Sequence, residues 1–121
     1  MAFPSPAADY IEQNLDLNAL CIAHPSATFF MQMGSDDLQG LGIHSGDLLV
    51  VDRSLAPATG DVVVIEYGGE RLCRELLSTD SGSVSVASHS LSGHKVIELD
   101  GCQVEVFGVV AVAVKRFRVR S

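Results

Sequence analysis

The sequence predicts a single, mainly β domain, built as a strongly bent antiparallel sheet or partial barrel with an extended N-terminal arm and one short helix. The chain has 121 residues, which is close to the most common domain size. Hydrophobic residues make up 47% of it, enough to fill one continuous core. Short apolar runs alternate with Gly, Asp and Ser turn signals, a pattern typical of compact all-β domains.

The first residues predict an arm and then a short helix. Pro4 and Pro6 favour extended backbone, so residues 1–15 are expected to form an extended arm and residues 16–121 the domain. Asp16 can cap a helix over residues 17 to about 23, which Pro25 would end.

The rest of the chain predicts six or seven strands. Two of the runs are joined by Gly68-Gly69, a signal for a tight hairpin. The segment 34–46 has four glycines and clustered polar groups, so we expect it to be a loop of the kind that carries functional sites. The expected strands cover residues 28–33, 48–52, 61–67, 71–77, 83–87, 96–99 and 103–116.

The charge is unevenly distributed. The net charge is −7, yet half of the eight Lys and Arg residues lie at the C-terminus, as Lys115, Arg116, Arg118 and Arg120. The acidic body repels phosphate backbones, which argues against direct sequence-specific DNA binding. For the basic tail two interpretations stay open, a solubilising edge or a contact with nucleic acid or an acidic partner.

The cysteines and histidines predict no metal site, and nothing in the sequence implies a cofactor. Cys21, Cys73 and Cys102 are far apart and odd in number, so we expect free, buried thiols and no disulfide framework. His89 and His94 lie in a Ser/Gly-rich stretch and are expected to be solvated loop residues.

No segment predicts membrane insertion or export. The longest apolar run, residues 104–114, is too short to cross a bilayer and is expected to be a buried strand. The N-terminus has neither a basic region nor a hydrophobic one that would mark it for secretion. We therefore expect a cytoplasmic location.

Several motifs together resemble the processed form of the UmuD family, a branch of the LexA-like S24 peptidases. They are FPSPAADYIEQ, HPSAT, GDLLVVDRS, GDVVV and VFGVV, and the resemblance is weakest between residues 78 and 101. It implies a LexA/UmuD-like fold and self-cleavage by a Ser–Lys dyad, stimulated by RecA filaments. It also implies a homodimer that serves a UmuC-type, SOS-induced translesion DNA polymerase, with RecA filaments and the sliding clamp as further partners.

Both dyad positions implied by the resemblance carry other residues here. The nucleophile position falls on Asp37, in Ser35-Asp36-Asp37-Leu38, and the base position on Arg74. A guanidinium keeps its proton, so Arg74 cannot act as the general base. We therefore hypothesise a structural Asp37–Arg74 ion pair in a chain without peptidase activity; the alternative is that both side chains point into solvent. Ser35 is displaced from the nucleophile position and has only Arg74 as a local base.

The start of the chain also departs from full-length relatives. Ala2 takes the place of the glycine that follows the family's cleavage point, with only Met1 before it. We therefore expect a chain that corresponds to the processed form; whether the gene encodes it so or the chain was shortened stays open.

Three functions follow from the resemblance. The first is a catalytically inactive accessory subunit that binds a UmuC-type polymerase as a dimer, through the arm and the final strand. The second is an active Ser–Lys peptidase, and the third is a decoy that forms mixed dimers with an active relative. A DNA-binding repressor is the least favoured. Candidate contact residues are Phe3, Pro4, Tyr10, Ile11 and Phe107, although Phe107 is also a candidate for the core.

Overall fold

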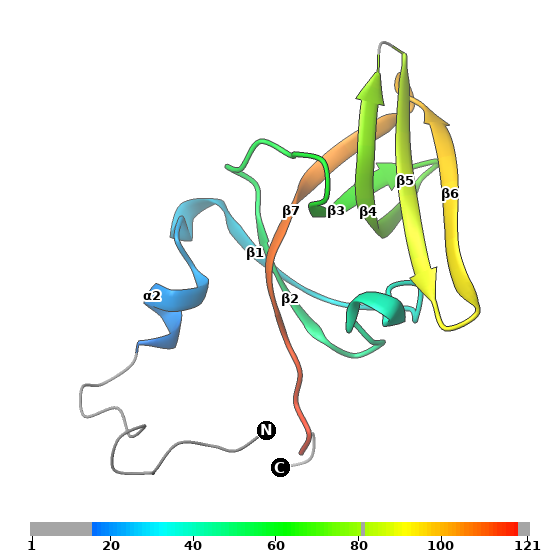
Figure 1. Ribbon diagram of the computed structural model, residues 1–121. Helices are drawn as coiled ribbons and strands as arrows, with labels where there is room; N and C mark the ends of the chain where they lie inside the picture. Colours follow the sequence, from blue (N-terminus) through cyan, green and yellow to red (C-terminus); the bar gives the residue numbers. More distant parts are fainter. Residues whose placement is uncertain (1–15, 81, 119–121) are drawn as a thin grey trace.

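A single antiparallel sheet of seven strands forms the domain, as the sequence predicts. The computed structural model describes residues 16–80 and 82–118, so the expected arm over residues 1–15 lies outside the described residues. The sheet has the order β1-β2-β7-β3-β4-β5-β6 (Figure 1). Its strands are β1 (Thr28–Gln32), β2 (Leu48–Asp52), β3 (Val62–Tyr67), β4 (Glu70–Asp80), β5 (Ser83–Ser90), β6 (Gly93–Asp100) and β7 (Val104–Val114).

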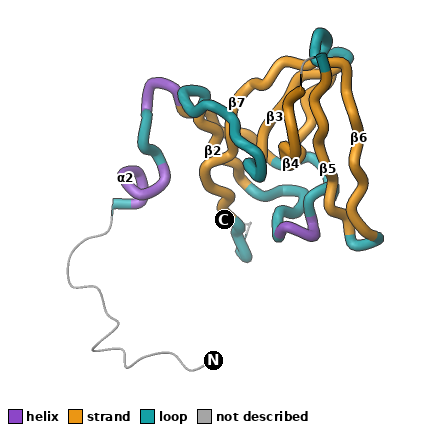
Figure 2. Tube along the Cα trace, turned by 45° about the horizontal axis from the view of Figure 1, so that its top comes forward, coloured by secondary structure: helices purple, strands orange, loops and turns teal. Residues whose placement is uncertain are grey.

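The short elements agree with their sequence signals. Helix α2 (Leu17–Cys21) is capped by Asp16, whose side chain accepts from the Asn18 N–H, and it ends two residues earlier than expected. In Figures 1 and 2 it stands away from the sheet, and none of its residues is buried. A 3₁₀ turn, η1 (Pro25–Ala27), precedes β1, and a second, η2 (Gln39–Leu41), lies in the loop that follows it.

Strands β5 and β6 are longer than their apolar runs predict. His89 of β5 pairs with His94 of β6, and Ser90 pairs with Gly93, so the ladder continues to the hairpin turn. Their polar side chains favour turns, but the backbone hydrogen bonds of an existing ladder override this weak propensity. The β3–β4 hairpin turn is as predicted, because Gly68 and Gly69 both adopt positive φ, which a tight type I′ turn requires.

Bulges explain how one sheet encloses two cores. Register shifts interrupt the β2–β7, β3–β7 and β4–β5 ladders, and such irregularities increase the local twist and bend. On β3, Val64 belongs to one core cluster, whereas its neighbours Val63 and Ile65 belong to the other. The strand is therefore buried on both faces, which accounts for its uninterrupted apolar sequence.

The final strand is buried only in its middle. Phe107, Gly108 and Val109 are buried, whereas Ala111, Ala113 and Val114 are exposed. The expectation of a buried strand over this whole run is therefore wrong at its C-terminal end, where β7 pairs with β2 alone. Within the described residues, no helix is long and apolar enough to cross a membrane.

Candidate functional site

The loop between β1 and β2 is fixed to the domain by one buried side chain. Leu38 is fully buried and belongs to the same core cluster as Met33, the first residue of the loop, and Ile43 in its second half. The Ser45 N–H donates to Asp36 Oδ1 at 3.0 Å and ties the two arms of the loop together. The glycine-rich segment is thus an ordered platform that positions Asp37 beside the sheet.

Asp37 and Arg74 form the ion pair that the sequence predicts. Arg74 Nη2 of β4 lies 3.3 Å from Asp37 Oδ2. The Arg74 side chain is 12% exposed and that of Asp37 is 45% exposed, so the pair sits at the edge of the core with its carboxylate partly in water. Ser35 Oγ donates to the same carboxylate oxygen at 2.9 Å. The alternative with both side chains in solvent is excluded for Arg74.

The surroundings of Arg74 leave it strongly dependent on Asp37. Its Nη1 donates to the Cys73 carbonyl at 2.8 Å, while its buried Nε has no hydrogen-bond partner in the described part of the chain. Asp37 is the anion that the structure places against this nearly buried cation. Since the guanidinium keeps its proton, Arg74 cannot accept a proton from Ser35, whose hydroxyl donates to Asp37 instead.

A cavity of about 260 Å³ adjoins the ion pair. It lies between the outer edge of β1, an edge strand, and residues 71–74 of β4, which pair with β3 on one side only. Its lining combines apolar side chains such as Met31, Met33, Leu49 and Leu72 with polar ones that include Asp37 and Arg74. The cavity therefore lies between two strand edges that have free backbone groups within the described residues.

Cys73 contributes a sulfur atom to this cavity but no ready nucleophile. Burial raises the pKa of its thiol to about 11, and the nearby Arg74 guanidinium offsets this only in part. The thiolate is the reactive form, so at neutral pH the side chain behaves as a small apolar group. Among the three cysteines, all free, only Cys73 is buried; Cys21 is half-buried and Cys102 is exposed, which corrects the expectation of three buried thiols.

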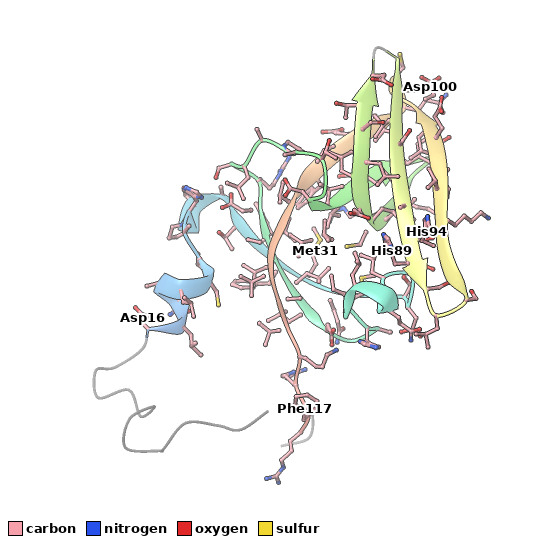
Figure 3. The ribbon with its side chains drawn as sticks, in the orientation of Figure 1. Asp16, Met31, His89, His94, Asp100 and Phe117 are labelled. Carbon is pink, nitrogen blue, oxygen red and sulfur yellow. The ribbon has the colours of Figure 1, made fainter. Side chains whose placement is uncertain are left out.

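His89 and His94 are strand residues, not loop residues as expected; His89 is half-buried, whereas His94 is exposed to solvent as expected. Their rings stack at a centroid distance of 5.7 Å on neighbouring strands (Figure 3). His89 Nε2 lies 2.5 Å from Glu75 Oε1, and the His89 backbone N–H donates to the Asp37 carbonyl at 2.6 Å. These contacts fasten the Asp37 loop to β4 and β5. No local motif signals these contacts, because only cross-strand pairing brings the three residues together.

Two buried carboxylates, Asp47 and Asp52, lie at the start and at the end of β2. The Asp47 carboxylate accepts from the His44 N–H at 2.9 Å and from Lys115 Nζ at 2.7 Å, and these bonds lower its pKa in that order of importance. Lys115, the first residue of the basic tail, is therefore tied to the body of the domain. In the described part of the chain, no group of three His, Cys, Asp or Glu side chains could hold a metal ion.

Asp52 ties the turn before β1 to the end of β2. Its Oδ1 accepts from Ser54 Oγ at 2.6 Å, and its Oδ2 lies 2.6 Å from His24 Nδ1. The Ser54 hydroxyl, and next the His24 ring, lower the pKa of the Asp52 carboxyl from 3.8 to about 2. The folded protein therefore stabilises the ionised form of the Asp52 carboxylate.

Asp52→Asn is expected to destabilise the protein at neutral pH and to do so less as the pH falls. A carboxyl whose pKa is lowered by folding contributes stability above its unfolded pKa, and this contribution is lost as the pH falls from about 4 to about 2. Urea midpoints of the wild type and the variant should therefore converge over that range. A gap that stays constant would contradict the assignment; Glu98→Gln, an exposed carboxylate of β6, is the control.

The predicted contact residues fall into two groups. Phe3, Pro4, Tyr10 and Ile11 lie outside the described residues. Phe107 is only 9% exposed and belongs to a core cluster, with the Phe29 ring edge-on at 5.5 Å. The expectation that Phe107 offers an exposed anchor is thus not met, because β7 turns this side chain inward and two arginines cover it. These arginines, Arg53 and Arg71, were not singled out from the sequence, since one follows β2 and the other lies in β4, and only the fold brings them to the same ring.

Known proteins resemble this chain over nearly its whole length. Protein ImpA of Salmonella typhimurium is 40% identical over 116 residues, covering 96% of the chain and 78% of that protein. Protein MucA of Escherichia coli is 37% identical over 108 residues, or 89% and 73% of the two chains. Protein SamA of Salmonella typhimurium is 53% identical over 74 residues, or 61% and 53%. Residues 1–111 match the family described as peptidase S24-like. The chain therefore belongs to the peptidase S24-like family, as its resemblance to the UmuD-like members predicts.

Proposed function

We propose that this chain is a non-hydrolytic, UmuD-like accessory subunit of an error-prone translesion DNA polymerase of the UmuC type. One observation carries the proposal: Asp37 and Arg74, at the positions that the resemblance assigns to nucleophile and base, bind each other at 3.3 Å. A Ser–Lys mechanism needs a hydroxyl and a neutral amine, and this pair supplies neither. A chain that keeps the fold without this chemistry would act by binding other proteins, in the cytoplasm where the polymerase works.

The outer face of the β1-β2-β7 end supports action as a dimer. Phe30 pairs with Val50, and Val50 pairs with Val112, so the three side chains form one row across the strands. Two residues further along, Leu48 pairs with Val114 on the same face. Phe30 is 58% exposed and Val114 is 36% exposed. Val50, in the middle of the row, is only 3% exposed, so the exposed apolar area of this face is centred on Phe30 and Val114. An exposed apolar area on a sheet face suits a protein–protein interface. A second copy of the chain is the partner that the proposed function assigns to it.

The proposal predicts no proteolysis by the purified wild-type chain. Incubation with a full-length UmuD- or LexA-type substrate, at high pH and with RecA filaments, should leave the substrate intact because Arg74 cannot take a proton from a nucleophile. An active relative serves as the positive control. The Asp37→Ser/Arg74→Lys double variant is the matched comparison. If the double variant cleaves the substrate and the wild type does not, these two side chains account for the missing activity. Cleavage by the wild type would reject the proposal.

Association with the polymerase is tested separately. The tagged chain, co-expressed with a UmuC-type polymerase, is expected to retain that polymerase through purification, and light scattering should find the chain as a dimer. Phe30→Glu should shift the chain toward a monomer, whereas Glu98→Gln on β6 should not. A chain that inhibits cleavage by an active relative but never binds a polymerase would instead be a mixed-dimer decoy.

A further inference from the structure

Two arginines far apart in the sequence stack on one aromatic ring. The Arg53 Cζ atom lies 4.3 Å from the centroid of the Phe107 ring, and the Arg71 Cζ atom lies 4.4 Å from it. Arg53 follows β2 and Arg71 belongs to β4, so the fold, and not local sequence, brings the two charges together. Cation–π contacts of this kind hold a guanidinium in place while leaving its edge free to donate hydrogen bonds.

The arrangement of Arg53 depends on close packing. Its Nε donates to the Phe107 carbonyl at 2.8 Å. A Cβ at Gly108 would lie 3.2 Å from Arg53 Cγ and 2.7 Å from Val51 Cγ1, so only glycine lets the arginine stem cross β7 here. The guanidinium is therefore held against the ring at both its stem and its Nε.

Within the described residues, Arg71 has one weak ion pair, with Glu66, and Arg53 has none. The carboxylate nearest to Arg71 belongs to Glu66, whose Oε1 lies 3.6 Å from Arg71 Nη2, beyond hydrogen-bond distance. Asp52, next to Arg53 in sequence, is already bound by Ser54 and His24. Arg53 and Arg71 are also two of only four basic residues outside the C-terminal tail of a chain with net charge −7. Like charges held together in this way favour an incoming anion.

The surroundings indicate an extended peptide as the carrier of that anion. Arg71 also lines the 260 Å³ cavity, beside the β4 residues that pair with β3 on one side only, so a peptide backbone could pair with this edge. Phe29, 43% exposed and 5.8 Å from Arg53 Cζ, adds apolar contact area. A long polyanion such as DNA would be repelled by the acidic body of the domain. A single carboxylate of a peptide would interact mainly with the two arginines, because screening by salt limits charge interactions to short distances.

We infer that Arg53 and Arg71, stacked on Phe107, form a binding site for an Asp or Glu side chain of an extended peptide segment of a partner protein. The inference goes beyond the proposed function, because it concerns an acidic segment whatever protein carries it. It needs neither the polymerase nor the absence of proteolysis.

A phage-displayed library of random short peptides, panned against the full-length chain, tests the site. Recovered peptides should be enriched in Asp or Glu, and replacing that residue by Gln or Asn in the best peptide should weaken binding about fivefold or more. Arg53→Gln and Arg71→Gln should each cause a similar loss for the acidic peptide and none for its amide version. Lys95→Gln, which removes one positive charge on β6 at the opposite edge of the sheet, should change neither.

Two further measurements keep the result unambiguous. Arg71→Lys keeps the charge but loses the planar guanidinium with its two parallel donors. It should therefore bind the acidic peptide more tightly than Arg71→Gln but less tightly than the wild type. Thermal melts verify that each variant is folded. Recovery of peptides without acidic enrichment, or acidic peptides that bind both Gln variants as well as the wild type, would overturn the inference. So would binding of a single-stranded oligonucleotide that needs both arginines when no acidic peptide binds.

Discussion

Leu38→Ala is expected to lower the free energy of unfolding by about 3–5 kcal/mol, the largest loss we predict for a single substitution. The Leu38 side chain is fully buried among core residues of β2, β3, β4 and β7, so its removal leaves a cavity that the surrounding strands cannot close. Urea unfolding followed by circular dichroism measures the effect. The loop carrying Asp37 should also lose protection from hydrogen exchange, because Leu38 is its anchor in the core.

Leu41→Ala is the matched control for this prediction. Leu41 lies three residues later in the same loop, in η2, but is 41% exposed, so its truncation should cost less than about 1 kcal/mol. Equal costs for the two variants would mean that Leu38 does not anchor the loop. The platform on which the candidate site rests would then have to be held by the backbone contacts to β5 alone.

Removing either partner of the Asp37–Arg74 pair is expected to destabilise the protein by about 2–3 kcal/mol. Asp37→Ala leaves a guanidinium that is 12% exposed without its anion, and Arg74→Ala also removes packing of the arginine stem. The cost stays below that of a fully buried pair because the Asp37 side chain is 45% exposed.

A double-mutant cycle isolates the interaction from these other losses. Unfolding of the two single variants and the double variant should give a coupling energy of about 1–2 kcal/mol. The exposed Arg71–Glu66 pair, with a separation of 3.6 Å, is a matched control for which we expect a coupling near zero. Additive losses at Asp37 and Arg74 would show that the contact contributes nothing to stability. The presence of Asp and Arg at these two positions would then have no structural role.

Local signals in the chain were sufficient for most of the secondary structure. Apolar runs bounded by Gly, Asp and Ser predict all seven strands, and β2 has the predicted bounds. The Gly68-Gly69 turn and the Asp16 cap depend on residues next to each other in sequence, and both are present. The additional length of β5 and β6 was not predictable, because the polar residues there become strand through the partner strand opposite them.

The candidate site could be predicted only in part. The resemblance to the family pointed to Asp37 and Arg74, and opposite charges at the two positions predicted that they would meet. The His89–Glu75 contact and the stacking of Arg53 and Arg71 on Phe107 could not be found in this way. They join residues from separate strands whose side chains carry no shared motif.

The sequence by itself determined a one-domain antiparallel sheet, the places where its strands turn, and a pair of complementary charges where a proton acceptor would be needed. Each of these depends on neighbouring residues or on the chemistry of a single side chain. Only the tertiary structure decided which strands lie side by side, that Phe107 faces inward, and which charges gather at the cavity. Those outcomes depend on strand order and on the bulges that bend the sheet, and both arise from packing between residues far apart in the chain.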